Sequence, residues 1–198
     1  MRHKQIKDLV FAAILIALTI LLSLPYLVIP VGTVAITLAH ITVLVGAILL
    51  GKNYGATLGA VMGIASMVIA SLMLGVNAPF TNPLLSVVPR IFFGWITYYI
   101  YSFFNKKIDH RPLAIGLTMI VSTLIHSLVV LTIMYFVVNT GFYFTASENP
   151  MSINGNIVPF VIAVLGSNAI LEILLAVAIG TPIVLVMDKV IANEEIDL

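Results

Sequence analysis

The sequence contains no cysteine and few charged residues. Without cysteine, the chain can form no disulfide, no thiolate metal site and no thiol nucleophile. Asp, Glu, Lys and Arg together make up 9% of its 198 residues, whereas a soluble domain usually carries about 25%. Hydrophobic residues make up 61%, which is more apolar surface than a soluble fold of this length can bury. Lipid solvates such side chains directly, so the composition predicts an integral membrane protein.

Motifs that carry catalytic or nucleic-acid-binding chemistry are also missing. There is no glycine-rich phosphate loop, so we do not expect the chain itself to hydrolyse ATP. The HExxH spacing of metalloproteases and the Gly-x-Ser-x-Gly elbow of serine hydrolases are absent. The basic residues are scattered, which argues against nucleic-acid binding. We therefore predict no enzyme activity, no metal and no bound cofactor.

Long apolar runs divide the chain into six predicted membrane crossings. Each crossing of the hydrocarbon core needs about 17–25 apolar residues. We expect the crossings near 8–26, 36–51, 54–76, 83–105, 112–139 and 157–188. The second is short, and the first reads as a retained helix rather than a cleaved signal peptide. The predicted fold is an all-α bundle of six transmembrane helices that forms a single membrane domain over 1–198.

Lys and Arg residues mark one side of the predicted bundle. Six crossings place nearly all of them on the same side as both termini, and the positive-inside rule makes that side cytoplasmic. These residues are Arg2, Lys4, Lys7, Lys52, Lys106, Lys107, Arg111 and Lys189. The outer loops predicted near 27–35, 77–82 and 140–156 contain no Lys or Arg. We therefore predict a multi-pass cell-membrane protein with both termini in the cytoplasm.

Five polar side chains fall within the predicted crossings, where ionisable groups are costly in lipid. They are His40, Arg90, His126, Asn168 and Glu172. All five lie in the outer half or at the middle of the membrane. Bridges that only hold helices together would have no reason to avoid the inner half. This distribution favours a polar cavity that opens to the outside over purely structural bridges.

Arg90 is the basic residue that the positive-inside pattern leaves unexplained. Asn82 followed by Pro83 predicts a capped helix start, which puts Arg90 about 12 Å further in. Pro89 predicts a kink directly before it. We expect the guanidinium to snorkel outward, to pair with Glu172, or to hold the carboxylate of a ligand by two parallel hydrogen bonds.

Two sequence blocks resemble the S components of energy-coupling factor (ECF) transporters. Residues 38–51 read LAHITVLVGAILLG, and residues 82–94 read NPLLSVVPRIFFG. The likeness covers nearly the whole chain and is greatest to the pantothenate-specific members. It implies a subunit that binds a vitamin from outside and then topples in the membrane against a transmembrane coupling protein (EcfT-like). Two cytoplasmic ATPases (EcfA-like) would use the ATP.

The resemblance also implies roles for individual residues. Ala13 and Ala17, four apart on the first helix, would contact the coupling protein. Arg90 would hold the carboxylate of pantothenate, and Trp95 would form an apolar wall. We predict that Glu172 is paired with His126 or Arg90, or is protonated, since a free carboxylate would repel the ligand. The predicted substrate-binding residues are Arg90, Asn82, His126, Asn168, His40, Trp95 and Glu172.

Three other functions stay open at this point. The first is an S component for folate or riboflavin, although a chain with a single Trp offers few stacking faces to such rings. The second is an intramembrane enzyme that uses His40, His126 and Glu172, which would have to lie within about 3 Å of one another. The third is a helix-packing subunit without a ligand, which a closed, dry outer half would support.

Overall fold

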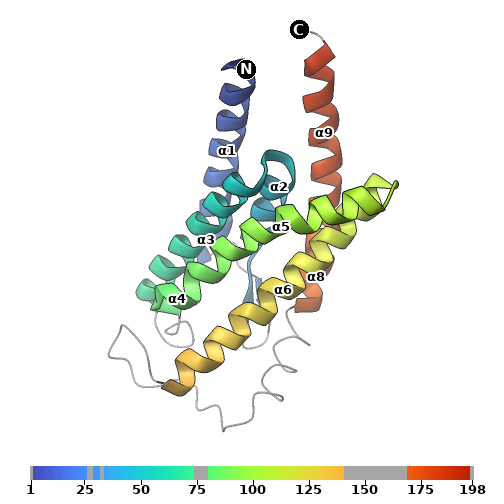
Figure 1. The fold of residues 1–198 in the computed structure, drawn as a ribbon. Coiled ribbons are helices and arrows are strands. Elements are labelled where there is room, and N and C mark those ends of the chain that lie inside the picture. Colours follow the sequence, from blue (N-terminus) through green and yellow to red (C-terminus); the bar gives the residue numbers. More distant parts are fainter. Residues whose placement is uncertain (1, 26–28, 32–33, 74–79, 141–168, 197–198) are drawn as a thin grey trace.

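The computed structural model describes residues 2–25, 29–31, 34–73, 80–140 and 169–196 (Figure 1). Its helices are α1 (Arg2–Ser23), α2 (Ala39–Leu50), α3 (Lys52–Met73), α4 (Pro83–Ser86), α5 (Val88–Lys107), α6 (Arg111–Thr140), α8 (Ile170–Leu175) and α9 (Thr181–Ile196), with a π-helical segment, η4 (Ala176–Gly180), between the last two. Two short strands, β1 (Ile29–Val31) and β2 (Val34–Ile36), pair antiparallel with Ile29 opposite Ile36. The α-helical class predicted from composition therefore holds for the membrane-spanning elements, and a small hairpin lies where a loop was expected.

Five of the described helical segments are long and apolar enough to cross a membrane. They are Gln5–Ser23, Lys52–Leu72, Pro83–Lys107, Arg111–Val137 and Ile170–Val190. The 12 residues of α2 extend only about 18 Å, against a hydrocarbon core of about 30 Å. These lengths agree with the predicted multi-pass membrane protein, and α2 is the short second segment. The first part of the sixth predicted crossing, 157–168, lies outside the described residues.

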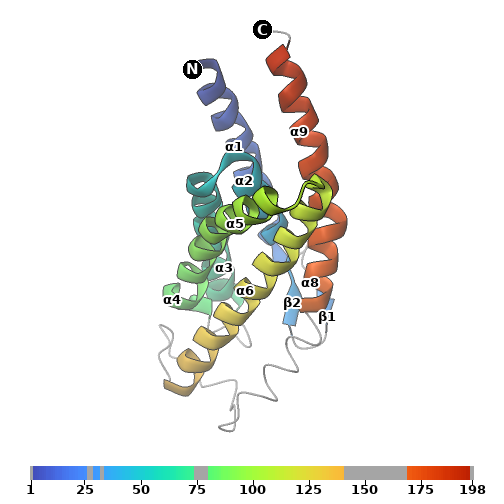
Figure 2. The same ribbon diagram turned by 45° about the vertical axis from the view of Figure 1, so that its right-hand side comes forward.

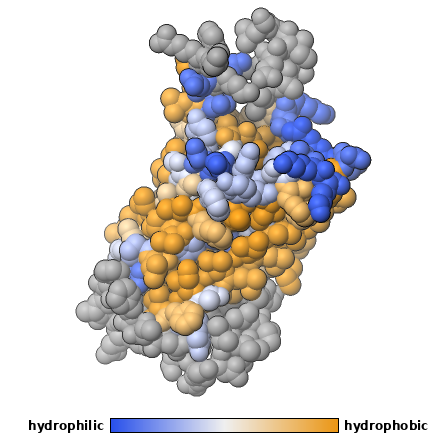
Figure 3. Space-filling model, in the orientation of Figure 1, coloured by the Kyte–Doolittle hydropathy of each residue, from blue (hydrophilic) through white to orange (hydrophobic). Residues whose placement is uncertain are grey.

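Both ends of the chain lie at the same end of the molecule (Figures 1 and 2). α1, α3 and α6 run away from that end, whereas α2, α5 and the α8–α9 segment run toward it. The surface follows the same division, because a hydrophobic band over α5 and α6 gives way to hydrophilic atoms toward the termini (Figure 3). Apolar side chains thus cover the part of the molecule that lipid would surround.

A stripe of glycines lets α3 lie directly on α5. A Cβ added at Gly59 would lie 1.9 Å from the carbonyl O of Arg90, and one added at Gly63 would lie 2.6 Å from the Cα of Val87. On the other helix, a Cβ at Gly94 would lie 1.9 Å from the carbonyl O of Gly55. Small residues spaced by four allow this close backbone approach in lipid. The stripe serves internal packing, and it fixes the backbone that carries Arg90.

Candidate functional site

A capped and interrupted helix leads into the site. The Oδ1 of Asn82 accepts a hydrogen bond from the backbone N–H of Leu84 at 2.9 Å, and Pro83 occupies the first turn of α4. The Asn cap and Pro start predicted from the sequence are therefore confirmed. α4 ends after one turn, and α5 begins at Val88. Asn82 is buried, so the cap is part of the interior and not of a surface loop.

Arg90 lies directly after this interruption, and its side chain folds back along it. Nη1 donates to the carbonyl O of Ser86 at 2.7 Å and to that of Leu85 at 3.3 Å. Pro89 has no N–H, so it cannot supply the helical hydrogen bond that the Leu85 carbonyl would otherwise receive. The guanidinium replaces part of that bond. α4 and α5 are separated at Val87, two residues before Pro89, and the kink itself stays a prediction.

The Arg90 guanidinium still has hydrogen-bonding capacity to spare. The side chain is buried, with 8% of the residue exposed, and its Cζ lies 5.5 Å from the centroid of the Phe80 ring. Its Nε is buried without any hydrogen-bond partner. A buried donor left unpaired costs about 1–3 kcal/mol. A polar acceptor that reached this donor would recover that cost.

α6 contributes more buried polar atoms without partners. The Oγ of Ser122, the Oγ1 of Thr123 and the Nδ1 of His126 are buried and accept or donate no hydrogen bond. The His126 ring packs on the Phe93 ring of α5, with centroids 4.5 Å apart. Since Phe93 is three residues from Arg90 on α5, this contact brings the polar part of α6 close to the guanidinium.

Ser122 and Thr123 were not among the residues predicted from the sequence. Hydroxyl side chains in membrane helices usually bond to a carbonyl of the preceding turn, as Thr118 does to Ala114 at 2.7 Å. Their number in a sequence therefore says little about function. The signal that was available is the spacing of four between Ser122 and His126, which puts both on one face of α6.

His40 connects the short helix α2 to α8. Its Nδ1 lies 2.6 Å from the carbonyl O of Thr37, and its Nε2 lies 3.3 Å from the backbone carbonyl O of Glu172. A neutral imidazole can donate from only one of the two nitrogens. The buried His40 ring therefore lies between the carbonyls of Thr37 and Glu172 and, when neutral, donates to one of them.

Glu172 is partly buried, and its backbone carbonyl O lies 3.3 Å from the Nε2 of His40. No ion pair within 4 Å joins Arg90 to Glu172 in the part of the chain that the structure describes. The predicted pairing of Glu172 with Arg90 or His126 is thus absent there, and its protonation stays a prediction.

The remaining predicted site residues lie elsewhere. Asn168 lies outside the described residues. Trp95 is 40% exposed on the face of α5 that points away from the other helices. Its ring centroid lies 4.7 Å from that of Tyr99. Ala13 and Ala17 are both exposed on α1. The structure thus places His40 against the backbone of Glu172, packs His126 on Phe93 of α5, and puts Asn82 at the start of the interrupted helix that carries Arg90, whereas Trp95 lies on an exposed face.

Comparison with known proteins identifies the family. Residues 7–184 match the family described as ECF transporter, substrate-specific component. The chain is 30% identical to the pantothenate transporter PanT of Leuconostoc mesenteroides subsp. mesenteroides, over 96% of this chain and 98% of that protein. It is 27% identical to the pantothenic acid transporter PanT of Lactococcus lactis subsp. cremoris, over 96% of this chain and 97% of that protein. The chain therefore belongs to the substrate-specific components of ECF transporters.

Proposed function

We propose that this chain is the pantothenate-binding subunit of an ECF importer. Two relatives that are named as pantothenate transporters align with it along almost its entire length, which supports both the substrate and a single membrane domain. Membership of the family implies association with the other components of the ECF transporter and with a small-molecule substrate. The specific partners in this proposal are an EcfT-like coupling protein and two EcfA-like ATPases.

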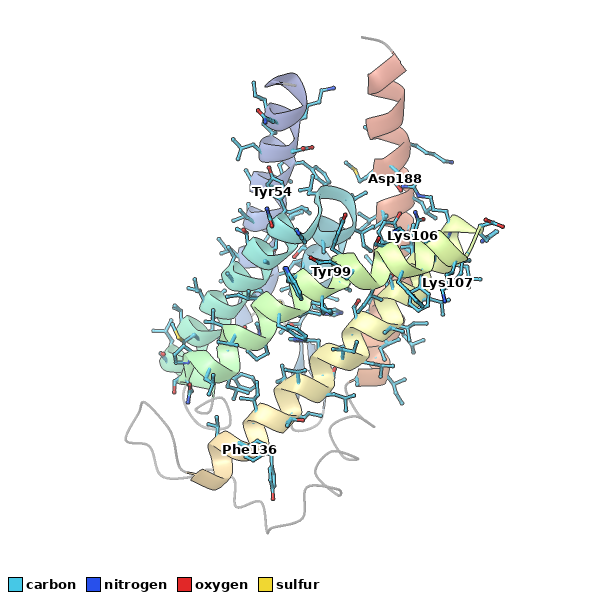
Figure 4. All side chains as sticks on the ribbon, in the orientation of Figure 1. Tyr54, Tyr99, Lys106, Lys107, Phe136 and Asp188 are labelled. Carbon is cyan, nitrogen blue, oxygen red and sulfur yellow. The ribbon has the colours of Figure 1, made fainter. Side chains whose placement is uncertain are left out.

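The proposed topology has six crossings, with both termini in the cytoplasm. The helices run alternately away from and toward the end where both termini lie, which supports an even number of crossings (Figure 1). Lys106 and Lys107 also lie toward that end (Figure 4). By the positive-inside rule, the end that gathers Lys and Arg faces the cytoplasm.

One observation carries the assignment of the site: four buried polar atoms on α5 and α6 have no partner. They are the Nε of Arg90, the Nδ1 of His126, the Oγ of Ser122 and the Oγ1 of Thr123. Pantothenate is an anion with hydroxyl and amide groups and no ring, so its carboxylate suits the arginine and its neutral groups suit α6. A hydrogen bond to a charged group contributes about 1.5–3 kcal/mol, and a neutral one about 0.5–1.5 kcal/mol.

The other predicted residues take supporting places in this proposal. Asn82 holds the start of α4, and His40 ties α2 to α8 beside Glu172. Asn168 stays a predicted ligand contact, four residues before Glu172. We leave Trp95 out of the site, because its ring is exposed on the opposite side of α5.

The partner surface in this proposal is the exposed face of α1. Ala13 and Ala17 are exposed there, together with large apolar side chains such as Leu9 and Ile14. An apolar helix face of this kind with small residues spaced by four suits close packing against another membrane helix. The face is available to a coupling protein without any change in the bundle.

The decisive experiment measures binding to the solitary purified protein. The small molecule that co-purifies should be pantothenate by mass spectrometry, and titration calorimetry should then give its Kd. Arg90→Ala should weaken binding by at least about tenfold, because a charged hydrogen bond is lost. Arg111→Ala is the matched control, since it removes the same side chain near the start of α6, where Arg111 pairs with Asp188 at 2.5 Å.

Two results would contradict the proposal. A yellow preparation containing flavin, or a folate in the mass spectrum, would assign a different vitamin. Unchanged affinity for pantothenate in a correctly folded Arg90→Ala protein would remove Arg90 from the site.

A further inference from the structure

The outer side of α5 carries a continuous apolar strip. The strip consists of Val88, Ile91, Phe92, Trp95 and Tyr99, and we call it the α5 strip. Each of these residues is 37–50% exposed. Spacings of three and four residues place them on one face of the helix. The first four line a shallow groove of about 270 Å³. This groove is apolar, so it can accept an alkyl chain but offers nothing to a polar ligand.

A cation is fixed at one end of the α5 strip. The Trp95 and Tyr99 rings are in contact, and the Nζ of Lys52 donates to the Oη of Tyr99 at 3.3 Å. The same Nζ lies 5.7 Å from the centroid of the Tyr99 ring. Gly51, with φ of 97°, makes the turn that places Lys52 at the first position of α3. There the ammonium adds to the positive end of the helix dipole, so this end of the strip favours an anion.

The α5 strip is about as long as one lipid acyl chain and lies in the part of the molecule that lipid would surround. From Val88 to Tyr99 it extends about 16 Å along the helix, close to half of a hydrocarbon core of about 30 Å. Tyr99 lies about midway along the molecule, between Phe136 and the end that carries both termini (Figure 4). The surface changes from hydrophobic to hydrophilic toward that end (Figure 3). Tyr and Lys at such a boundary lie at the level of lipid headgroups.

We propose that the α5 strip binds an anionic phospholipid. One acyl chain occupies the groove from Val88 to Trp95, and the phosphate lies against Lys52 and the hydroxyl of Tyr99. A zwitterionic lipid fills the groove equally well, but its headgroup carries no net charge to favour Lys52. The preference for the anionic lipid therefore depends on one lysine. This inference goes beyond vitamin binding and does not depend on it.

The experiment uses Trp95, which is the single Trp of the chain and belongs to the strip. The full-length protein is reconstituted into phosphatidylcholine vesicles that contain increasing fractions of a lipid brominated on its acyl chains. Quenching of Trp95 fluorescence by brominated phosphatidylglycerol is compared with quenching by brominated phosphatidylcholine. We expect phosphatidylglycerol to reach half-maximal quenching at about a fivefold lower fraction, which is the effect of one lysine near an anionic surface.

Variants separate this site from general electrostatics. Lys52→Gln should abolish the preference while leaving quenching by phosphatidylcholine in place, and Lys52→Arg should retain the preference. Lys189→Gln is the matched control, because it removes an exposed lysine of α9 that is not part of the strip. Equal quenching by the two lipids in the unmodified protein would overturn the proposal. A preference lost equally in Lys52→Gln and Lys189→Gln would overturn it too.

Discussion

At the scale of single residues, the arginine of the site has a structural task as well as a binding task. The Nη1 of Arg90 donates to the Leu85 carbonyl, which Pro89 leaves without a donor, and to the neighbouring Ser86 carbonyl, while its Nε stays unpaired. Guanidinium can do both because it presents five N–H donors in a rigid plane. A lysine at this position could not hydrogen-bond the carbonyls at the helix break and hold the carboxylate of a ligand in two parallel hydrogen bonds at the same time.

The hydroxyl groups of α6 allow the sharpest test of the site. Ser122→Ala and Thr123→Val each remove one unpaired polar atom, and each should raise the Kd for pantothenate by about 2–10-fold, the equivalent of one neutral hydrogen bond. Thr118→Val should leave the Kd unchanged, since the Thr118 hydroxyl already bonds to its own helix. Titration calorimetry on the three purified variants decides the matter. An equal rise in Kd for Thr118→Val and Thr123→Val would mean that the substitutions act through the packing of α6 and not through a hydrogen bond to the ligand.

For a substitution at Glu172 we predict tighter and not weaker binding of pantothenate. An ionised carboxylate at Glu172 repels an anionic ligand in the same site and competes with it for Arg90. Glu172→Gln keeps the shape of the side chain and removes the competing charge, so the affinity for pantothenate should rise. Calorimetry at low and high salt measures the change. A weaker complex would indicate that the carboxylate holds Arg90 in its binding position.

At the scale of helices, the contact between α3 and α5 determines where Arg90 lies. Gly59 faces the carbonyl O of Arg90 so closely that a methyl group has no room, whereas a Cβ at Gly116 of α6 meets nothing within 4 Å. Gly59→Ala should therefore lower the melting temperature and weaken pantothenate binding, because overpacking costs about 1–3 kcal/mol. Gly116→Ala should be neutral or slightly stabilising, since alanine favours a helix over glycine. Thermal unfolding in detergent compares the pair, and a stable Gly59→Ala protein with full affinity would contradict this packing.

The exposed face of α1 makes a prediction about assembly. Ala17→Phe puts a large ring where close helix packing needs a small residue, so co-purification with the coupling protein should be lost while pantothenate binding stays intact. Leu128→Phe is the control, because it enlarges an exposed apolar side chain on α6. If Ala17→Phe assembles normally, the coupling protein contacts another face.

At the scale of the whole molecule, the sequence predicted the helices better than it predicted their interactions. Apolar run lengths located the crossings, and Asn82-Pro83 located the start of α4, because both depend on local chemistry. Two features escaped it. The hairpin at 29–36 depends on pairing between strands, and the unpaired state of Ser122 depends on what α5 presents to it. Neither is encoded in a periodicity.

The last helical segment shows a signal that could have been read. The π-helical segment η4 ends at Gly180, directly before Thr181 and Pro182. Pro182 has no N–H for the carbonyl four residues earlier, so a regular helix cannot continue through this point without losing a hydrogen bond. π-helical turns are a common way to absorb such a fault. A Gly-Thr-Pro run inside an apolar segment therefore predicts an irregular helix.

The number of crossings and their direction can be tested on the intact protein in its own membrane. The chain has no cysteine, so single cysteines can be introduced without altering the background. Asn53→Cys and Asp109→Cys lie at exposed positions next to Lys52 and between Lys107 and Arg111, and a membrane-impermeant maleimide added to whole cells should label neither. Leu84→Cys, exposed at the opposite end of α5 beside Asn82, should be labelled from outside. With the N-terminus inside, loss of the α2 crossing would move every later segment to the other side of the membrane, so position 53 would be labelled and position 84 would not. The same pattern decides whether the Arg90 site opens toward the outside, where an importer must collect its substrate.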